Sequence, residues 1–137
     1  MTASHCFADY SSSDYDGLIA VIGRNDWTDS SSGERIGVST GFIHPDYREG
    51  SPNNDVCVLV LKHNVSAESL KYAVEYDVAV PQNGNFIHAG WGNTNANNDP
   101  ASSSHVLLTL NMGIVSQSTC QSVSAFPITD NVFCAGG

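Results

Sequence analysis

The residues of this sequence whose types could do chemistry together are His5, within Ala-Ser-His-Cys at residues 3–6, and Asp55, within Asn-Asp-Val at residues 54–56. A hydroxyl is a weak nucleophile until a nearby base takes its proton. The base in turn needs a carboxylate that fixes its tautomer and stabilises the imidazolium formed during attack. We therefore regard His5 as a candidate general base and Asp55 as a candidate orienting acid.

Both residues also have plain structural interpretations. Asp55 follows the turn-forming Pro-Asn-Asn at residues 52–54 and could simply cap that turn, while a single exposed histidine such as His5 is often inert. In favour of a catalytic role, Asp55 directly precedes the apolar run 56–61, which places a carboxylate at the edge of a core. Spacing alone leaves both interpretations open.

The four cysteines have different expected states. Cys120 and Cys134 would close a loop of about 15 residues, for which a cross-link stabilises by roughly 3 kcal/mol, so we expect them to form a disulfide. Cys57 lies within an apolar run and is expected to be a buried free thiol, whereas Cys6 has no evident partner. The triplet Asn-Val-Ser at 64–66 makes Asn64 a candidate glycosylation site on a surface loop.

The elements that must position these residues are expected to be strands. Short apolar runs separated by Gly, Ser, Asn, Asp and Pro clusters dominate, and no segment keeps a helical period for three turns, so the fold class is all-β. The expected strands are a hairpin of 17–22 and 36–43, the run 56–61 buried on both faces, and the alternating run 108–114 with one buried face. These patterns favour a barrel-like core.

One short helix and one boundary complete the expected organisation. The helix covers residues 118–122, with Ser116 or Ser118 as its N-cap. Pro81 and Gly84 interrupt the strand pattern among polar neighbours. We therefore expect two domains, at residues 1–80 and 81–137.

Charge and hydropathy exclude several classes of partner. The chain carries 5 Lys and Arg against 14 Asp and Glu, with a formal net charge of -9, so no basic surface for nucleic acid is expected. No apolar run reaches the roughly 18 residues of a membrane span, and the first residues have neither the basic nor the apolar region of a signal peptide.

Six segments, in order along the whole chain, resemble motifs of the trypsin/chymotrypsin family of serine proteases, peptidase family S1. They are Thr-Ala-Ser-His-Cys (2–6), His-Pro-Asp-Tyr (44–47), Asn-Asp-Val-Cys-Val-Leu (54–59), Ala-Gly-Trp-Gly (89–92), Ile-Val-Ser (114–116) and Ile-Thr-Asp-Asn-Val-Phe-Cys-Ala-Gly (128–136). The first resembles the family's Thr-Ala-Ala-His-Cys, which holds the general base, and the third resembles its Asn-Asp-Ile-Ala-Leu-Leu. Their common order makes coincidence a poor explanation.

The resemblance implies a fold, roles and a location. The fold is a double antiparallel β-barrel with the catalytic residues between the barrels, and His5 and Asp55 both come from the first barrel. The family's disulfides support pairing of Cys120 with Cys134 and give Cys6 a partner upstream of residue 1. The implied activity is serine-type endopeptidase hydrolysis of protein or peptide substrates by a secreted protein, without a cofactor.

The departures from the family are as informative as the matches. Neither the Ile-Val-Gly-Gly terminus nor the Gly-Asp-Ser-Gly-Gly segment that carries the nucleophile occurs in the sequence. We therefore expect a fragment that lacks both ends of the domain and is inactive alone, because loss of a nucleophile can cost about a millionfold in kcat. The alternative is a catalytically inert, protease-like module that binds a partner.

Family members also carry a calcium loop, which here would lie between the two strands of the hairpin. Asp26, Asp29 and Glu34 could supply oxygens, but Arg24 stands where the resemblance places the first glutamate ligand. A guanidinium there supplies positive charge in place of the ion, so we expect no metal. The remaining histidines, His44, His63, His88 and His105, show no metal-binding spacing.

Overall fold

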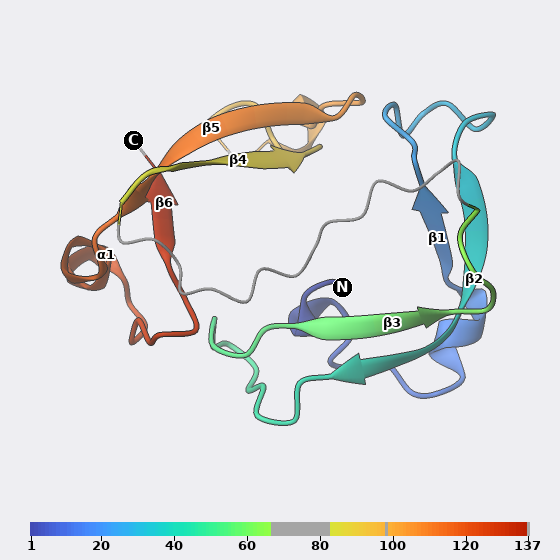
Figure 1. Cartoon of the computed structure of the whole chain (residues 1–137), viewed down its shortest axis with the longest axis horizontal. Coiled ribbons are helices and arrows are strands. Elements are labelled where there is room, and N and C mark those ends of the chain that lie inside the picture. Colours follow the sequence, from blue (N-terminus) through green and yellow to red (C-terminus); the bar gives the residue numbers. More distant parts are fainter. Residues whose placement is uncertain (67–82, 98, 137) are drawn as a thin grey trace.

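The computed structural model describes residues 1–66, 83–97 and 99–136, which form two antiparallel three-stranded sheets (Figure 1). The first sheet contains β1 (Ile19–Ile22), β2 (Glu34–Ile43) and β3 (Cys57–Leu61), and the second contains β4 (Asn85–Gly90), β5 (Leu108–Val115) and β6 (Cys134–Gly136). Helix α1 (Gln117–Val123) and the short 3-10 helices η1 (Ser4–Cys6), η2 (Asp14–Gly17) and η4 (Pro100–Ser102) complete the described elements. The all-β class expected from the sequence is confirmed, and neither sheet closes into a barrel within the described residues.

The first sheet begins with the expected hairpin of β1 and β2. Ile19 pairs with Gly37 and Ile22 with Glu34, so the turn-rich segment between the strands forms the connecting loop. Strand β2 also pairs with β3, from Val38 opposite Leu61 to Ile43 opposite Cys57, with a register shift between Val38 and Thr40. Strand β2 is therefore the central strand of the sheet and pairs with both β1 and β3.

The core of the first sheet is small. Among the described residues, the buried apolar side chains on this side of the molecule are Tyr15, Ile36, Val38 and Cys57. The Tyr15 ring, carried by η2, packs directly across the backbone of Gly41 in β2. Cys57 is fully buried as a free thiol, as its apolar run predicts.

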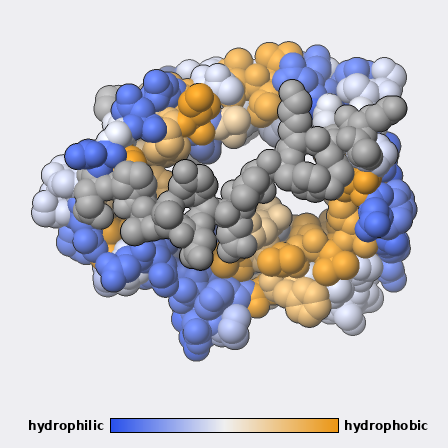
Figure 2. All heavy atoms as spheres, in the orientation of Figure 1, coloured by the Kyte–Doolittle hydropathy of each residue, from blue (hydrophilic) through white to orange (hydrophobic). Residues whose placement is uncertain are grey.

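Two burial predictions are wrong. Strand β3 is not buried on both faces, since Val58 is 45% exposed, and β5 has no buried face in its first half, where Leu110 is 58% exposed. Along β3, buried or half-buried residues alternate with exposed ones, and along β5 the first four residues are all exposed, because no second layer among the described residues covers these faces. Figure 2 shows the result, with hydrophobic surface over the region of β2 and β3 and again over the region of β4 and β5.

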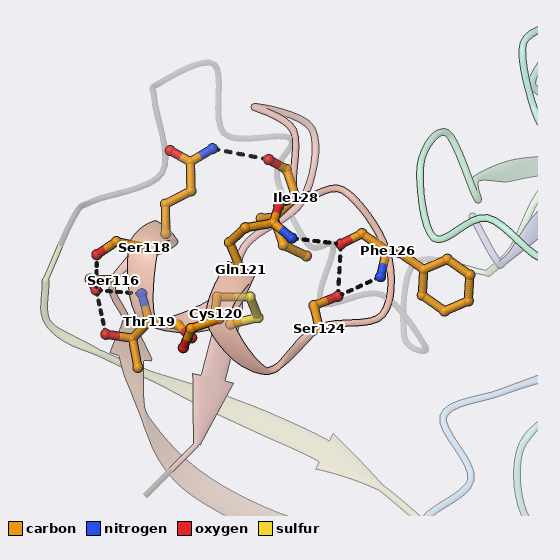
Figure 3. Close-up of a disulfide and its surroundings, with 11 residues drawn as sticks. Ser116, Ser118, Thr119, Cys120, Gln121, Ser124, Phe126 and Ile128 are labelled. Carbon is orange, nitrogen blue, oxygen red and sulfur yellow. Dashed lines mark hydrogen bonds between the residues drawn. A yellow bond between two sulfur atoms is a disulfide. The ribbon is translucent and has the colours of Figure 1, made fainter.

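Helix α1 follows β5 and is tied back to the second sheet (Figure 3). Of the two predicted N-cap residues the structure uses Ser116, whose Oγ accepts the backbone N–H of Thr119 at 3.2 Å. The expected disulfide joins Cys120 of α1 to Cys134 of β6, 14 residues apart, with 5.9 Å between their Cα atoms. The short helix is thus fixed at both its start and its middle.

Backbone contacts connect the two sheets. The N–H of Trp27 donates to the carbonyl of His105 at 3.0 Å, and the N–H of Leu107 donates to the carbonyl of Asn25 at 2.8 Å. The predicted boundary near residue 81 lies outside the described residues. In the described part of the chain, no helix is long and apolar enough to cross a bilayer.

Candidate catalytic site

The segment that carries His5 is fastened along the beginning of β3. Thr2 and Cys57 exchange both of their backbone hydrogen bonds, at 2.8 and 2.7 Å. The side chain of Ser4 is fully buried, and its Oγ donates to the carbonyl of Val56 at 2.7 Å. A buried hydroxyl would cost free energy without such a partner, so Ser4 fixes η1 relative to Val56, the residue that follows Asp55.

A tight turn aims Asp55 at η1. Asn54 has a φ of 59°, the left-handed region that few residues except Gly, Asn and Asp adopt readily. The N–H of Val56 reaches back to the carbonyl of Asn54 at 2.8 Å, which closes a three-residue turn around Asp55. The Asp55 side chain therefore leaves the chain just before β3 begins.

The carboxylate of Asp55 contacts His5 with both oxygens. Oδ1 accepts the backbone N–H of His5 at 2.8 Å, and Oδ2 lies 2.7 Å from the ring atom Nδ1. An ionised carboxylate can only accept, so this contact places the proton of a neutral imidazole on Nδ1 and the lone pair on Nε2. The imidazole is therefore oriented to act as a base through Nε2.

Two opposing effects set the pKa of Asp55. Partial burial raises it, while hydrogen bonds from the ring and backbone of His5 and from the backbone of Ser4 lower it, and the net pKa lies below the usual value of 3.8. Asp55 is therefore ionised at neutral pH. Tyr47 lies close enough to feel this charge: burial first, and then the charge of Asp55, raise the pKa of its phenol.

Exposure differs between the two partners in a way that suits their roles. The side chain of His5 is 63% exposed, whereas that of Asp55 is 23% exposed, so the imidazole faces solvent and the carboxylate lies behind it. The sulfur of Cys6 lies 3.5 Å from Nε2 of His5. Nε2 is otherwise open to a reacting group among the described residues.

Residues that follow α1 support the turn from the opposite side. The hydroxyl of Thr129 donates to Oδ1 of Asn53 at 2.5 Å, and the side-chain amide of Asn131 donates to Oδ1 of Asn54 at 3.2 Å. These two contacts join segments 76 and 77 residues apart in the sequence. The turn that aims Asp55 thus depends on both halves of the described chain.

The other predicted site residues lie apart from His5 and Asp55. Asn64 is exposed just after β3. Two of the three candidate calcium ligands bind their own loop, where Asp26 accepts from Thr28 and Asp29 accepts from Ser31, and these hydrogen bonds lower the pKa of both carboxyls. The third, Glu34, accepts the backbone N–H of Ser66 at 2.9 Å. No three His, Cys, Asp or Glu side chains gather to hold a metal within residues 1–66, 83–97 and 99–136. The predicted absence of calcium stays a prediction.

Sequence reasoning missed the residues that support the pair. Ser4 was visible within the histidine motif, but nothing in the motif shows that its hydroxyl is buried against Val56. The left-handed turn at Asn54 had a signal, since an Asn pair after Pro is typical of turns. The contacts of Thr129 and Asn131 had none, because they depend on how the two sheets meet.

Comparison with known proteins identifies the family of this chain. A family model described as Trypsin matches residues 1–137. The chain belongs to the trypsin family. It is 29% identical over 140 residues to a trypsin of Phaedon cochleariae, covering 99% of this chain and 52% of that protein.

Two further relatives show the range of proteins that this trypsin-family chain resembles. It is 32% identical over 141 residues to Trypsin 5G1 of Aedes aegypti, covering 99% of this chain and 50% of that protein. It is 25% identical over 142 residues to Transmembrane protease serine 9 of Rattus norvegicus, covering 99% of this chain and 13% of that protein. The chain therefore spans about half the length of the two trypsins.

Proposed function

We propose that this chain supplies the general base and the orienting acid of a secreted serine endopeptidase. The observation that carries the proposal is the contact between Nδ1 of His5 and Oδ2 of Asp55 at 2.7 Å, which leaves Nε2 directed outward. The trypsin-family match supports the class of reaction, because both residues lie in segments that resemble the family's catalytic motifs.

The proposed mechanism assigns one step to each residue. Nε2 of His5 takes the proton from a serine hydroxyl as that oxygen attacks the carbonyl carbon of a protein or peptide substrate, and later gives the proton to the leaving amine. Asp55 stays ionised, holds the proton on Nδ1 and stabilises the imidazolium. The serine itself, and the donors that stabilise the oxyanion, would come from a segment outside these 137 residues.

The proposal extends to organisation and processing. Residues 1–80, which hold His5 and Asp55, would belong to the first barrel, and residues 81–137 would begin the second. Exposed Asn64 would carry the glycan in a secreted parent protein. Enzymatic deglycosylation of the secreted protein should raise its electrophoretic mobility, and Asn64→Gln should remove that shift.

The direct test uses the protease encoded by the full-length transcript. With a peptide amide substrate, Asp55→Asn should lower kcat by about 10⁴-fold, as in the Ser-His-Asp template, because the amide favours the wrong tautomer. His5→Ala should lower kcat by a similar or larger factor. His63→Ala is the matched control, since the ring contacts only the carbonyl of Asn64 among the described residues and should leave kcat within about twofold.

Two outcomes would overturn the proposal. A transcript that encodes no serine motif after residue 137 would favour the inert, partner-binding module instead. Full activity of His5→Ala in a full-length protein would show that His5 does not act as the base.

The isolated 137-residue chain is measured separately with the same substrate. We expect no hydrolysis by this chain alone.

A further inference from the structure

A cavity lies where the two sheets meet, on a different part of the molecule from His5 and Asp55. Its volume is about 260 Å³, and its lining residues are Val21 of β1, Arg24 and Trp27 of the following loop, and Trp91 after β4. Trp27 and Trp91 are the only two tryptophans in the sequence. The cavity therefore has two large aromatic walls, one from each side of the junction.

Both indole rings are fixed across the junction. Nε1 of Trp27 donates to the carbonyl of Ser104 at 2.9 Å, and Nε1 of Trp91 donates to the carbonyl of Asn25 at 2.9 Å. Each tryptophan thus donates to the opposite side of the junction. Because their N–H groups are already satisfied, the rings present apolar faces to an occupant and lose little freedom when it binds.

Both tryptophans remain accessible although they are fixed. Trp27 is 51% exposed and Trp91 is 37% exposed. Exposed aromatic surface in a rigid, concave setting is where a flat apolar group gains the most contact area. The room available is suited to one ring and a short side chain.

Arg24 determines the charge that the occupant should carry. Its Nε and Nη2 donate to the carbonyl of Ser32 at 3.0 and 2.8 Å, which holds the side chain in place. Nη1 has no hydrogen-bond partner among the described residues. Asp29 interacts with the same positive charge, but its Oδ1 already accepts from the backbone and hydroxyl of Ser31.

Because a guanidinium lies at its wall, this cavity differs from the aromatic cages that bind cations. Two indole faces alone would attract an ammonium group, but the charge of Arg24 opposes it. A carboxylate is favoured instead, because it can accept from Nη1 in the planar geometry that arginine provides.

We propose that this cavity binds a small aromatic carboxylic acid, with its ring between Trp27 and Trp91 and its carboxylate on Arg24. The site does not use His5 or Asp55, so a test of this binding site does not depend on the proposed proteolytic function. Since the ligand would contact residues from both sides of the junction, it would also hold the two sheets together.

The test uses the protein encoded by the full-length transcript and follows the NMR signals of the indole N–H groups of Trp27 and Trp91, which are assigned with Trp27→Phe and Trp91→Phe. Three probes of equal size are titrated, namely 3-phenylpropionate, 3-phenylpropanamide and 3-phenylpropylamine. We expect a saturable shift of both indole signals with the acid, with a Kd on the order of 1 mM for a ligand of this size. The amide should bind about 5- to 10-fold more weakly, and the amine more weakly still.

Arg24→Met should remove the preference for the acid over the amide while the ring still binds. Arg48→Met is the matched control, because Arg48 is exposed, bonds only to the carbonyls of Pro45 and Tyr47 among the described residues, and does not line the cavity. The wild-type probe series requires no variant to fold. Absence of a saturable shift with the acid, binding of the amine as tight as that of the acid, or an unchanged preference in Arg24→Met would each overturn the proposal.

Discussion

Asp55 uses its two oxygens for two purposes. Oδ1 holds the backbone of His5, while Oδ2 holds the ring of the same residue. A single carboxylate therefore fixes the position of η1 and the tautomer of the imidazole. Any change that removes its charge is expected to act on local folding as well as on the base.

Acid should destabilise the chain partly through Asp55. Its pKa is lower in the folded state than its usual value of 3.8, so its contribution to stability is fully present above about pH 4 and is lost as the pH falls through the folded-state pKa. We expect the free energy of unfolding, measured with urea, to fall between pH 6 and pH 3, and to fall less in Asp55→Asn. Asp9→Asn is the control, because that exposed carboxylate has no hydrogen bond in the described structure. An equal fall in Asp55→Asn and wild type would contradict the prediction.

At the scale of elements, short helices are positioned by single close contacts. The 3-10 helix η2 is fixed by Tyr15, which is 4% exposed and packs against β2. Helix α1 is fixed by the Ser116 cap and the disulfide through Cys120. Substitution of one of these residues is therefore expected to loosen the helix that it holds against its sheet.

Gly41 is required by the ring that crosses it. A Cβ at this position would lie 2.5 Å from Cε1 and 2.6 Å from the hydroxyl oxygen of Tyr15, closer than real contacts allow. Gly41→Ala should lower the free energy of unfolding by about 1–3 kcal/mol through overpacking. Gly92→Ala is the matched control, since nothing lies within 4 Å of its added Cβ. Chemical denaturation of both variants compares them, and equal stability would show that Tyr15 is not packed there.

The N-cap of α1 can be tested with two neighbouring serines. Ser116→Ala removes the acceptor for the N–H of Thr119 and should cost about 1 kcal/mol of stability. Ser118→Ala removes a hydroxyl that contacts Ser116 but does not accept the N–H of Thr119, so its effect should be smaller. Thermal unfolding followed by circular dichroism ranks the two variants. A larger loss of stability in Ser118→Ala than in Ser116→Ala would show that Ser116 is not the N-cap.

At the scale of the whole molecule, surface area exceeds what a folded protein of this mass exposes. The accessible surface is 10026 Å² for a chain of 14.5 kDa, whereas a compact monomer of this mass exposes about 6,900 Å². The excess includes the apolar faces of β3 and β5 already described. Uncovered apolar sheet faces and strand edges promote association between molecules.

The isolated chain should therefore be poorly soluble or loosely packed. We expect strong binding of a hydrophobic dye such as anilinonaphthalene sulfonate, a broad thermal transition and weak near-UV circular dichroism. Full-length protein from the same transcript is the control and should bind little dye. A sharp transition with a strong near-UV spectrum in the isolated chain would contradict this prediction.

The sequence alone determined features that depend on neighbours along the chain. The strand runs, the β1 and β2 hairpin, a serine cap at residue 116 or 118 and the Cys120 to Cys134 disulfide follow from periodicity, turn chemistry and short loop closure, which act over a few residues. The motifs around His5 and Asp55 also identified the candidate pair and the family.

Only the tertiary structure decided what covers each surface and which distant groups meet. Alternation along residues 108–114 correctly predicts a strand, but burial of one face depends on another layer that no local pattern encodes, and the first half of β5 is exposed throughout. Thr129 and Asn131 hydrogen-bond to the turn before Asp55, Trp27 donates to the carbonyl of Ser104, and Trp91 donates to the carbonyl of Asn25. Each of these contacts joins segments more than 60 residues apart. Such contacts arise only when the sheets pack, because their partners are set by three-dimensional placement rather than by sequence spacing.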